Sequence, residues 1–132
     1  MSKYLFYFLF TFALLSCTQN TTKEENIEEE ETPDLKVSKV IARGRTLFQS
    51  QCALCHALHQ KLAGPPLAGV QERHDKEWLF KFIRNSQQMI QEGDKKAVAI
   101  YEEYNKVPMQ SFNLIDADIE AILRYIESEG KP

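Results

Sequence analysis

The sequence predicts an all-α fold, built as one small helical domain. In four segments the apolar residues recur three and four positions apart, which is the spacing of an amphipathic helix. No stretch of convincing length alternates apolar and polar residues as a half-buried strand would. The 132-residue chain has room for one ordinary domain once its N-terminal part is set aside.

The N-terminal 16 residues predict an export signal. Lys3 precedes an apolar run from Tyr4 to Leu15, which is shorter than the roughly 18 to 20 residues that a membrane-spanning helix needs. The run ends at Leu14-Leu15-Ser16-Cys17, which resembles the lipobox of bacterial lipoprotein signal peptides, where cleavage leaves a diacylated cysteine as the first mature residue. We therefore expect a signal peptide over residues 1–16 and a lipid on Cys17. The alternative is an ordinary signal peptide with a chance cysteine.

Residues 17–34 predict a lipidated, acidic and flexible linker. Residues 18–34 contain seven Asp or Glu and one Lys, with almost nothing apolar to bury. Residues 35–132, where we expect the folded domain, contain fourteen Lys or Arg against twelve Asp or Glu. This near balance argues against nucleic acid as a partner, because binding it needs a far larger basic excess on one face.

The first helix is expected over residues 35–50, directly before the first cysteine of the domain. Gly44 within it costs about 1 kcal/mol against Ala, so it needs a packing reason, such as the close approach of another helix. The apolar residues of this helix are Val37, Val40, Ile41, Leu47 and Phe48.

Three more helices are expected after a Gly- and Pro-rich loop over residues 61–69. The first of them starts at Asp75 and ends near Asn85-Ser86. The next follows Gly93-Asp94, and the last runs from Asp116 to just before Gly130. Their apolar stripes are Trp78, Leu79, Phe82 and Ile83, then Ala97, Ile100, Tyr101 and Tyr104, then Ile119, Ile122, Leu123 and Ile126.

With Cys17 assigned to lipid, the other two cysteines stand in Cys52-Ala53-Leu54-Cys55-His56. Two thiols separated by two residues can form thioethers to both vinyl groups of one porphyrin, and the next side chain, the His56 imidazole, can then ligate the iron. This is the attachment pattern of c-type haem, and it predicts one covalently bound haem.

Three other interpretations of Cys52 and Cys55 are weaker. A structural zinc site needs four ligands, and no second Cys pair or spaced His pair follows. A thioredoxin-like redox pair is embedded in a βαβ pattern, which this helical sequence lacks. A simple disulfide leaves the adjoining His56 without a role.

Met109 is the leading candidate for the second axial iron ligand. It follows Pro108, which interrupts helix, so its thioether projects from irregular backbone that can be shaped around an iron. Met89 is more typical of a gap-filling apolar residue. His59 lies too close in sequence to the proximal histidine to reach the opposite haem face, and His74 is expected at an exposed turn. These three residues and an open position are the alternatives.

Residues 37–129 resemble the class I cytochrome c family. Gly44-x-x-x-Phe48 is similar to the family's first-helix pattern, and Ile122-x-x-Tyr125 is similar to its partner on the last helix. In the family these two helices cross through contacts of small residues with aromatic ones, which would explain Gly44. The resemblance implies a cytochrome c-like helical domain wrapped around one covalently bound haem c with its iron.

The resemblance also implies how both axial ligands are surrounded. Gly64-Pro65 is similar to the family's proximal loop, so the carbonyl of Pro65 is expected to accept a hydrogen bond from His56 and orient it. Pro108-Met109 is similar to the distal methionine loop, although Gln110-Ser111-Phe112 is not the commonest continuation.

These features predict an electron carrier, not an enzyme. A Met/His pair leaves no open iron position, and thioether ligation raises the reduction potential. The expected protein is anchored by its lipid on the periplasmic side of a bacterial membrane. There it would transfer single electrons between a redox donor and acceptor, which are membrane respiratory complexes or a periplasmic reductase.

Two alternatives to a mobile carrier are kept. The first is a fixed cytochrome subunit of a larger oxidoreductase, which shares all of the haem chemistry. The second is a peroxidase-type haem enzyme or a haem sensor with an open iron position. It is less favoured, because the chain is small and offers neither a second haem motif nor an obvious distal acid–base pair.

Overall fold

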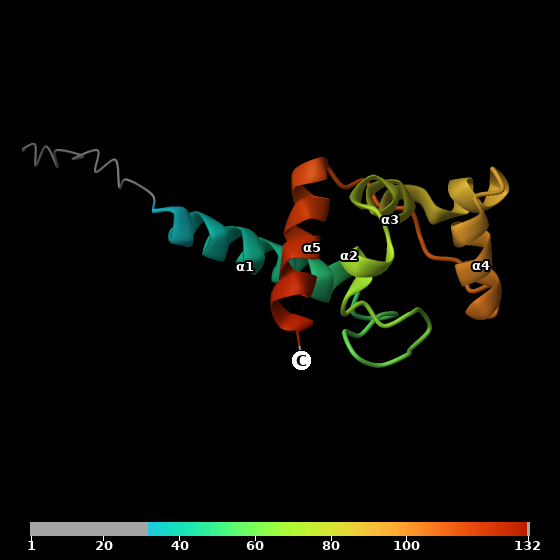
Figure 1. Ribbon diagram of the computed structural model, residues 1–132, viewed down its shortest axis with the longest axis horizontal. Helices are drawn as coiled ribbons and strands as arrows, with labels where there is room; N and C mark the ends of the chain where they lie inside the picture. The colour runs from blue at the N-terminus through green and yellow to red at the C-terminus, as the bar shows by residue number, and fades with distance from the viewer. Residues whose placement is uncertain (1–31, 132) are drawn as a thin grey trace, which may run out of the picture. The chain divides into compact units, whose positions relative to one another are not determined.

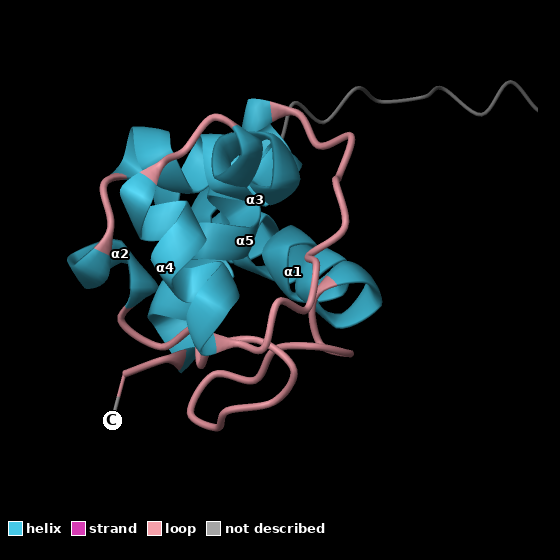
Figure 2. Cartoon of the chain, turned by 90° about the vertical axis from the view of Figure 1, so that its right-hand side faces the viewer, coloured by secondary structure: helices cyan, strands magenta, loops and turns pink. Residues whose placement is uncertain are grey.

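The computed structural model of the chain describes residues 32–131. The predicted signal peptide, Cys17 and nearly all of the predicted linker lie outside the described residues. Residues 32–131 form helices and loops without a strand, which confirms the all-α expectation (Figure 2). None of the helices in this part of the chain is long and apolar enough to cross a membrane.

Five helices follow one another along the described chain. They are α1 (Pro33–Gln51), α2 (Val70–Arg73), α3 (Lys76–Gln91), α4 (Lys95–Glu103) and α5 (Asp116–Glu129). Helix α1 packs against α5, and α3 packs against both α4 and α5 (Figure 1). The one-turn helix α2 was not expected from the apolar pattern, because four residues are too few to show a helical period.

Helix α1 begins two residues before the predicted start. The hydroxyl oxygen of Thr32 accepts a hydrogen bond from the backbone N–H of Leu35 at 3.4 Å and so caps the helix. Pro33 then suits the first helical position, because the N–H that proline lacks would have no partner there. The helix therefore starts directly after the run of glutamates.

The crossing of α1 and α5 depends on Gly44. A Cβ atom on Gly44 would lie 1.9 Å from the carbonyl oxygen of Ala121, so only glycine permits this contact. One turn further along, the rings of Phe48 and Tyr125 pack with their centroids 5.3 Å apart. The expected close approach of another helix at Gly44 is confirmed.

The apolar stripe of α5 forms the centre of the core, as its periodicity predicted. Its members Ile119, Ile122, Leu123 and Ile126 are all buried. The prediction fails for one end of the first helix, where Val37 and Val40 are 55% and 39% exposed. Because α5 crosses α1 near Gly44, it does not cover these two residues.

Helix α3 breaks near its predicted end but then continues. Asn85 has φ −156° and ψ 79°, which is not helical, and the chain returns to helix up to Gln91. The side-chain oxygen of Asn85 accepts a hydrogen bond from the backbone N–H of Gln88 at 3.0 Å, so it caps the second part of the helix. Directly after the break, Ser86 is only 1% exposed.

Asp94 joins α3 to α4. Its carboxylate accepts hydrogen bonds from the backbone N–H of Ala97 at 2.8 Å and from the indole N–H of Trp78 at 3.1 Å. These two donors hold the pKa of Asp94 below its ordinary value. Asp94 therefore caps α4 and fixes the orientation of Trp78 on α3.

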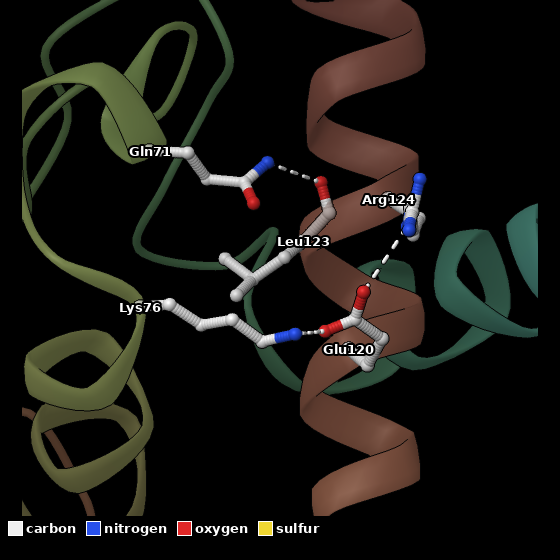
Figure 3. A network of polar contacts seen from close by, with 5 residues as sticks. All are labelled: Gln71, Lys76, Glu120, Leu123 and Arg124. Atoms are coloured by element: carbon white, nitrogen blue, oxygen red, sulfur yellow. Dashed lines mark hydrogen bonds and ion pairs between the residues drawn. The ribbon is translucent and has the colours of Figure 1, made fainter.

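Polar contacts join α2 and α3 to α5 (Figure 3). The side-chain amide of Gln71 donates a hydrogen bond to the carbonyl oxygen of Leu123 at 3.1 Å. Glu120 lies between Lys76 of α3 and Arg124 of α5 and pairs with both. The hydrogen bond from Lys76 is the largest of the influences that lower the pKa of Glu120.

Candidate functional site

The two cysteines and the histidine of the motif lie in one compact turn at the end of α1. Cys52 is the C-cap of α1, and its backbone N–H donates to the carbonyl oxygen of Phe48 at 2.8 Å. The N–H groups of Cys55 and His56 then both donate to the carbonyl oxygen of Cys52, at 3.1 and 2.9 Å. Because the backbone closes on itself here, all three side chains line the same cavity.

The imidazole of His56 is held by the loop that follows it. Its Nδ1 lies 2.9 Å from the carbonyl oxygen of Pro65, the contact that the family resemblance implied. With the Nδ1 proton donated to this carbonyl, Nε2 carries the free lone pair that a metal needs. Gly64 lies against the ring, where a Cβ atom would be 2.3 Å from Cε1 of His56.

The Pro65 loop is itself fixed from two sides. The backbone N–H of Gly64 donates to the carbonyl oxygen of Cys55 at 2.9 Å. The guanidinium of Arg73 donates to the carbonyl oxygens of Ala68 at 2.6 Å and Pro66 at 2.9 Å. Arg73 was not singled out in the sequence, because donation to backbone carbonyls leaves no pattern in residue types.

Met109 reaches the same cavities from the loop between α4 and α5. Two residues with positive φ, Asn105 at 57° and Lys106 at 59°, end α4 and redirect the chain. The N–H of Lys106 donates back to the carbonyl oxygen of Tyr101 at 2.8 Å, which satisfies one of the last carbonyl groups of the helix. The hydroxyl of Ser86 lies 3.5 Å from the carbonyl oxygen of Met109.

Two cavities, of about 200 and about 570 Å³, share Cys52, His56, Pro65 and Met109 in their walls. The larger volume lies within the roughly 300 to 1,000 Å³ of typical cofactor sites. Apolar and aromatic side chains make up most of the remaining wall, among them Leu67, Phe82, Ile83, Ile100, Tyr104 and Ile126. The residues present therefore fit a large, flat, mainly apolar cofactor that the two cysteines attach at one edge.

The other candidate ligands occupy different positions. Met89 is buried at 8% exposure and lines neither of the two cavities, as a gap-filling residue would. His59 is exposed and also lines neither cavity.

His74 lies in a bend between α2 and α3, as expected, but the expectation that it is exposed there is wrong. The residue is half-buried and lines the larger cavity, and its ring stacks on Trp78 with the ring centroids 4.5 Å apart. Burial, followed by the positive charges of Lys96 and Arg73, lowers the pKa of His74.

The state of the cysteines bears on the competing interpretations of the motif. Burial raises the pKa of the Cys52 thiol to about 11, whereas a reactive redox cysteine has a lowered pKa. Cys52 and Cys55 form no disulfide in the described part of the chain. Within residues 32–131, no group of three or more His, Cys, Asp or Glu side chains is arranged to hold a metal ion.

The helical fold and this site together define a c-type haem protein. A family model of cytochrome c matches residues 41–129 of the chain. The chain belongs to the cytochrome c family, whose members bind haem c covalently and transfer electrons through its iron.

Solved structures of cytochromes c are similar to this chain. Cytochrome c from Rhodothermus marinus aligns with a TM-score of 0.64 at 26% identity, over 70% of this chain and 78% of that one. An engineered form of it, bound to a carbene intermediate, aligns with a TM-score of 0.60 at 26% identity, over 70% and 79%. A cytochrome c domain from Pseudomonas putida aligns with a TM-score of 0.59 at 30% identity, over 66% and 87%. No curated protein matches the chain.

Proposed function

We propose that the chain is a lipid-anchored, mono-haem c-type cytochrome that transfers single electrons between redox partners on the periplasmic side of a bacterial membrane. The observation that carries this proposal is that His56 and Met109, from distant parts of the sequence, line the same cavities as Cys52. One imidazole and one thioether are the ligand pair of electron-transferring cytochromes c.

Each residue of the site has one proposed task. Cys52 and Cys55 hold the cofactor through thioethers, and His56 and Met109 ligate its iron. The carbonyl oxygen of Pro65 keeps the His56 proton on Nδ1, so that Nε2 remains free to ligate. When bound, the haem supplies a reversible one-electron couple, and the apolar wall excludes water from it.

The electronic spectrum of the holoprotein, beside that of a Met109→Ala variant, tests the ligand set. We expect low-spin bands in the reduced wild type and a ferric sulfur-to-iron charge-transfer band that disappears in the variant. A high-spin wild type, or a variant identical to it, would remove Met109 from the site.

A haem protein with an open iron position should bind carbon monoxide differently. A peroxidase-type enzyme or a haem sensor would bind carbon monoxide readily in the reduced state, because no sixth ligand has to leave. A carrier with Met109 in place would bind it slowly or weakly.

The membrane anchor rests on Cys17 and the apolar run before it. Several acyl chains, at about 0.8 kcal/mol per buried methylene, would hold the protein on the bilayer, and the acidic linker would let the domain reach nearby partners. A Cys17→Ser variant should appear in the soluble periplasmic fraction with its haem spectrum unchanged. If it stayed with the membrane, another anchor would be responsible.

A mobile carrier and a fixed oxidoreductase subunit share this site and differ in how long the domain stays docked. A carrier docks weakly, through a small interface, so that it can leave after each transfer. Co-purification after gentle solubilisation separates them, since a subunit stays with its complex and a carrier does not.

A further inference from the structure

The segment that carries Met109 takes its position from contacts with another part of the chain. Residues 107–115 form neither helix nor strand. Within the described chain, Phe112 is the only residue of 108–115 whose backbone N–H donates to another backbone group. Its acceptor is the carbonyl oxygen of Arg84 in α3, at 3.0 Å. Contacts with α3 therefore supply order that the backbone of the segment does not supply by itself.

The side chain of Arg84 contacts the same segment further along. Its Nε donates a hydrogen bond to the carbonyl oxygen of Leu114 at 3.3 Å, and its guanidinium pairs with the carboxylate of Asp116, the first residue of α5. Leu114 is buried, whereas the ion pair with Asp116 is largely exposed and so contributes little by itself. Arg84 thus contacts the segment through both its backbone and its side chain.

The break at Asn85 allows two neighbouring residues of α3 to contact this segment. In a continuous helix, Arg84 and Ser86 would point about 200° apart around the axis, because each residue turns by about 100°. Asn85 is extended instead, with φ −156° and ψ 79°, so the residues on either side of it can face the same way. The hydroxyl of Ser86 accordingly lies 3.5 Å from the carbonyl oxygen of Met109.

Asn85 also supplies a hydrogen bond that the break would otherwise cost. An unbroken helix pairs the N–H of residue 88 with the carbonyl oxygen of residue 84. Here the side-chain oxygen of Asn85 accepts from the N–H of Gln88 at 3.0 Å. The carbonyl oxygen of Arg84 can then accept from Phe112 without leaving Gln88 unsatisfied at the start of the second part of the helix.

We propose that Asn85 and Arg84 are positioning residues for Met109. Asn85 breaks and caps α3, and Arg84 then binds the segment from Phe112 to Asp116, so that Met109 is held against the iron. Both residues act on the iron only through Met109. The inference rests on the proposed function, since it requires Met109 as the axial ligand.

Imidazole affinity of the ferric holoprotein tests the proposal, because imidazole binds only when Met109 has left the iron. We expect Asn85→Ala to raise this affinity about three- to tenfold, the effect of losing one helix-capping hydrogen bond. Asn85→Asp keeps an oxygen acceptor at the cap and should stay near the wild-type value. The control is Thr32→Ala, which removes the cap of α1 and should leave the affinity unchanged. An unchanged affinity in Asn85→Ala would overturn the proposal.

A second variant tests the side chain of Arg84. Arg84→Gln keeps the backbone contact with Phe112 but removes the donors to Leu114 and Asp116, so it should raise the imidazole affinity about two- to fivefold. Lys81→Gln removes a positive charge from an exposed position one turn earlier in α3 and should leave the affinity unchanged. If the two variants had the same affinity, Arg84 would have no part in holding Met109 and the proposal would be wrong.

A Met109→Ala background separates positioning of the ligand from a general loosening of the cavity. Imidazole then binds without displacing a thioether, so Asn85→Ala should no longer change the affinity. An equal increase in both backgrounds would contradict the proposal. A wild type without the sulfur-to-iron band, and with the same imidazole affinity as Met109→Ala, would instead reject the ligand assignment of Met109 itself.

Discussion

The ammonium group of Lys61 lies 4.3 Å from the centre of the Tyr104 ring. Lys61 belongs to the loop that carries Pro65, and Tyr104 caps the end of α4, just before the segment that carries Met109. The contact therefore connects the segment that orients His56 with the segment that carries Met109, the proposed opposite ligand. Cation–π contacts at exposed sites contribute about 0.5 to 1 kcal/mol.

Loss of this contact should make Met109 easier to displace. We expect Lys61→Ala and Tyr104→Leu each to increase the rate of imidazole binding to the ferric protein about two- to fivefold, the equivalent of 0.5 to 1 kcal/mol. Tyr104→Phe keeps an aromatic ring and should resemble the wild type, as should Lys81→Ala at an exposed position of α3. If Tyr104→Phe were as fast as Tyr104→Leu, the hydroxyl and not the ring would be responsible.

Replacement of Gly44 should destabilise the whole domain. The Cβ atom of an alanine would meet the backbone of Ala121, which cannot move without shifting α5. We expect Gly44→Ala to lower the free energy of unfolding by about 3 kcal/mol, the upper end of overpacking effects, although the same change in an exposed helix would be stabilising. Urea denaturation of the holoprotein measures this. Ser38→Ala, at an exposed position of α1, is the control, and equal stability of the two variants would contradict the prediction.

The features that the sequence predicted are those encoded over a few neighbouring residues. The Cys52 to His56 motif closes within one turn, so its spacing alone determines that the three side chains converge. The stripe of α5 is buried because helical periodicity decides which side chains share a face. Gly44 was informative as well, because glycine is unfavourable inside a helix and its presence there needs a tertiary cause.

The features that the sequence did not predict depend on tertiary geometry. The exposure of Val37 follows from where α5 crosses α1, which no local pattern specifies. Helix α3 breaks at Asn85 and the polar Ser86 is buried directly after it, although no residue pattern marks the break. The contact of Lys61 with Tyr104 joins residues far apart in the sequence, and neither residue type is unusual at the surface.

The protonation of His74 should make the stability of the protein depend on pH. Burial first, then Lys96 and Arg73, lower its pKa in the folded protein, while Asp75 opposes them. Between about pH 6.5 and the lower pKa of the folded state, the unfolded chain therefore binds more protons than the folded protein, and the free energy of unfolding falls as the pH falls. Above about pH 6.5 the contribution of His74 is fully present.

Two substitutions separate this titration from the stacking of His74 on Trp78. His74→Phe keeps a ring to stack but cannot bind a proton, so it should flatten the stability profile below about pH 6.5 and retain the stability at pH 8. His74→Gln should flatten the profile as well but lower the stability at every pH. Urea midpoints between pH 5 and pH 8 measure both effects. A His74→Phe profile as steep as that of the wild type would assign the pH dependence to other groups.

We expect Leu54 to make an apolar contact with the proposed redox partner. It lies between the two cysteines, lines the smaller cavity, and is 91% exposed, which is unusual for a large apolar side chain. A partner that docks over the cysteine edge of the cavity would cover it. Partial burial of one leucine corresponds to about 1 kcal/mol, so Leu54→Glu should raise the KM for the partner about fivefold. The rate of electron transfer to or from native membranes, measured against cytochrome concentration, gives this KM.

The control is Ile115→Glu, because Ile115 is 62% exposed but lines neither cavity. The KM of this variant should stay at the wild-type value. If the Ile115 variant were slowed and the Leu54 variant were not, the partner would dock on another face of the domain.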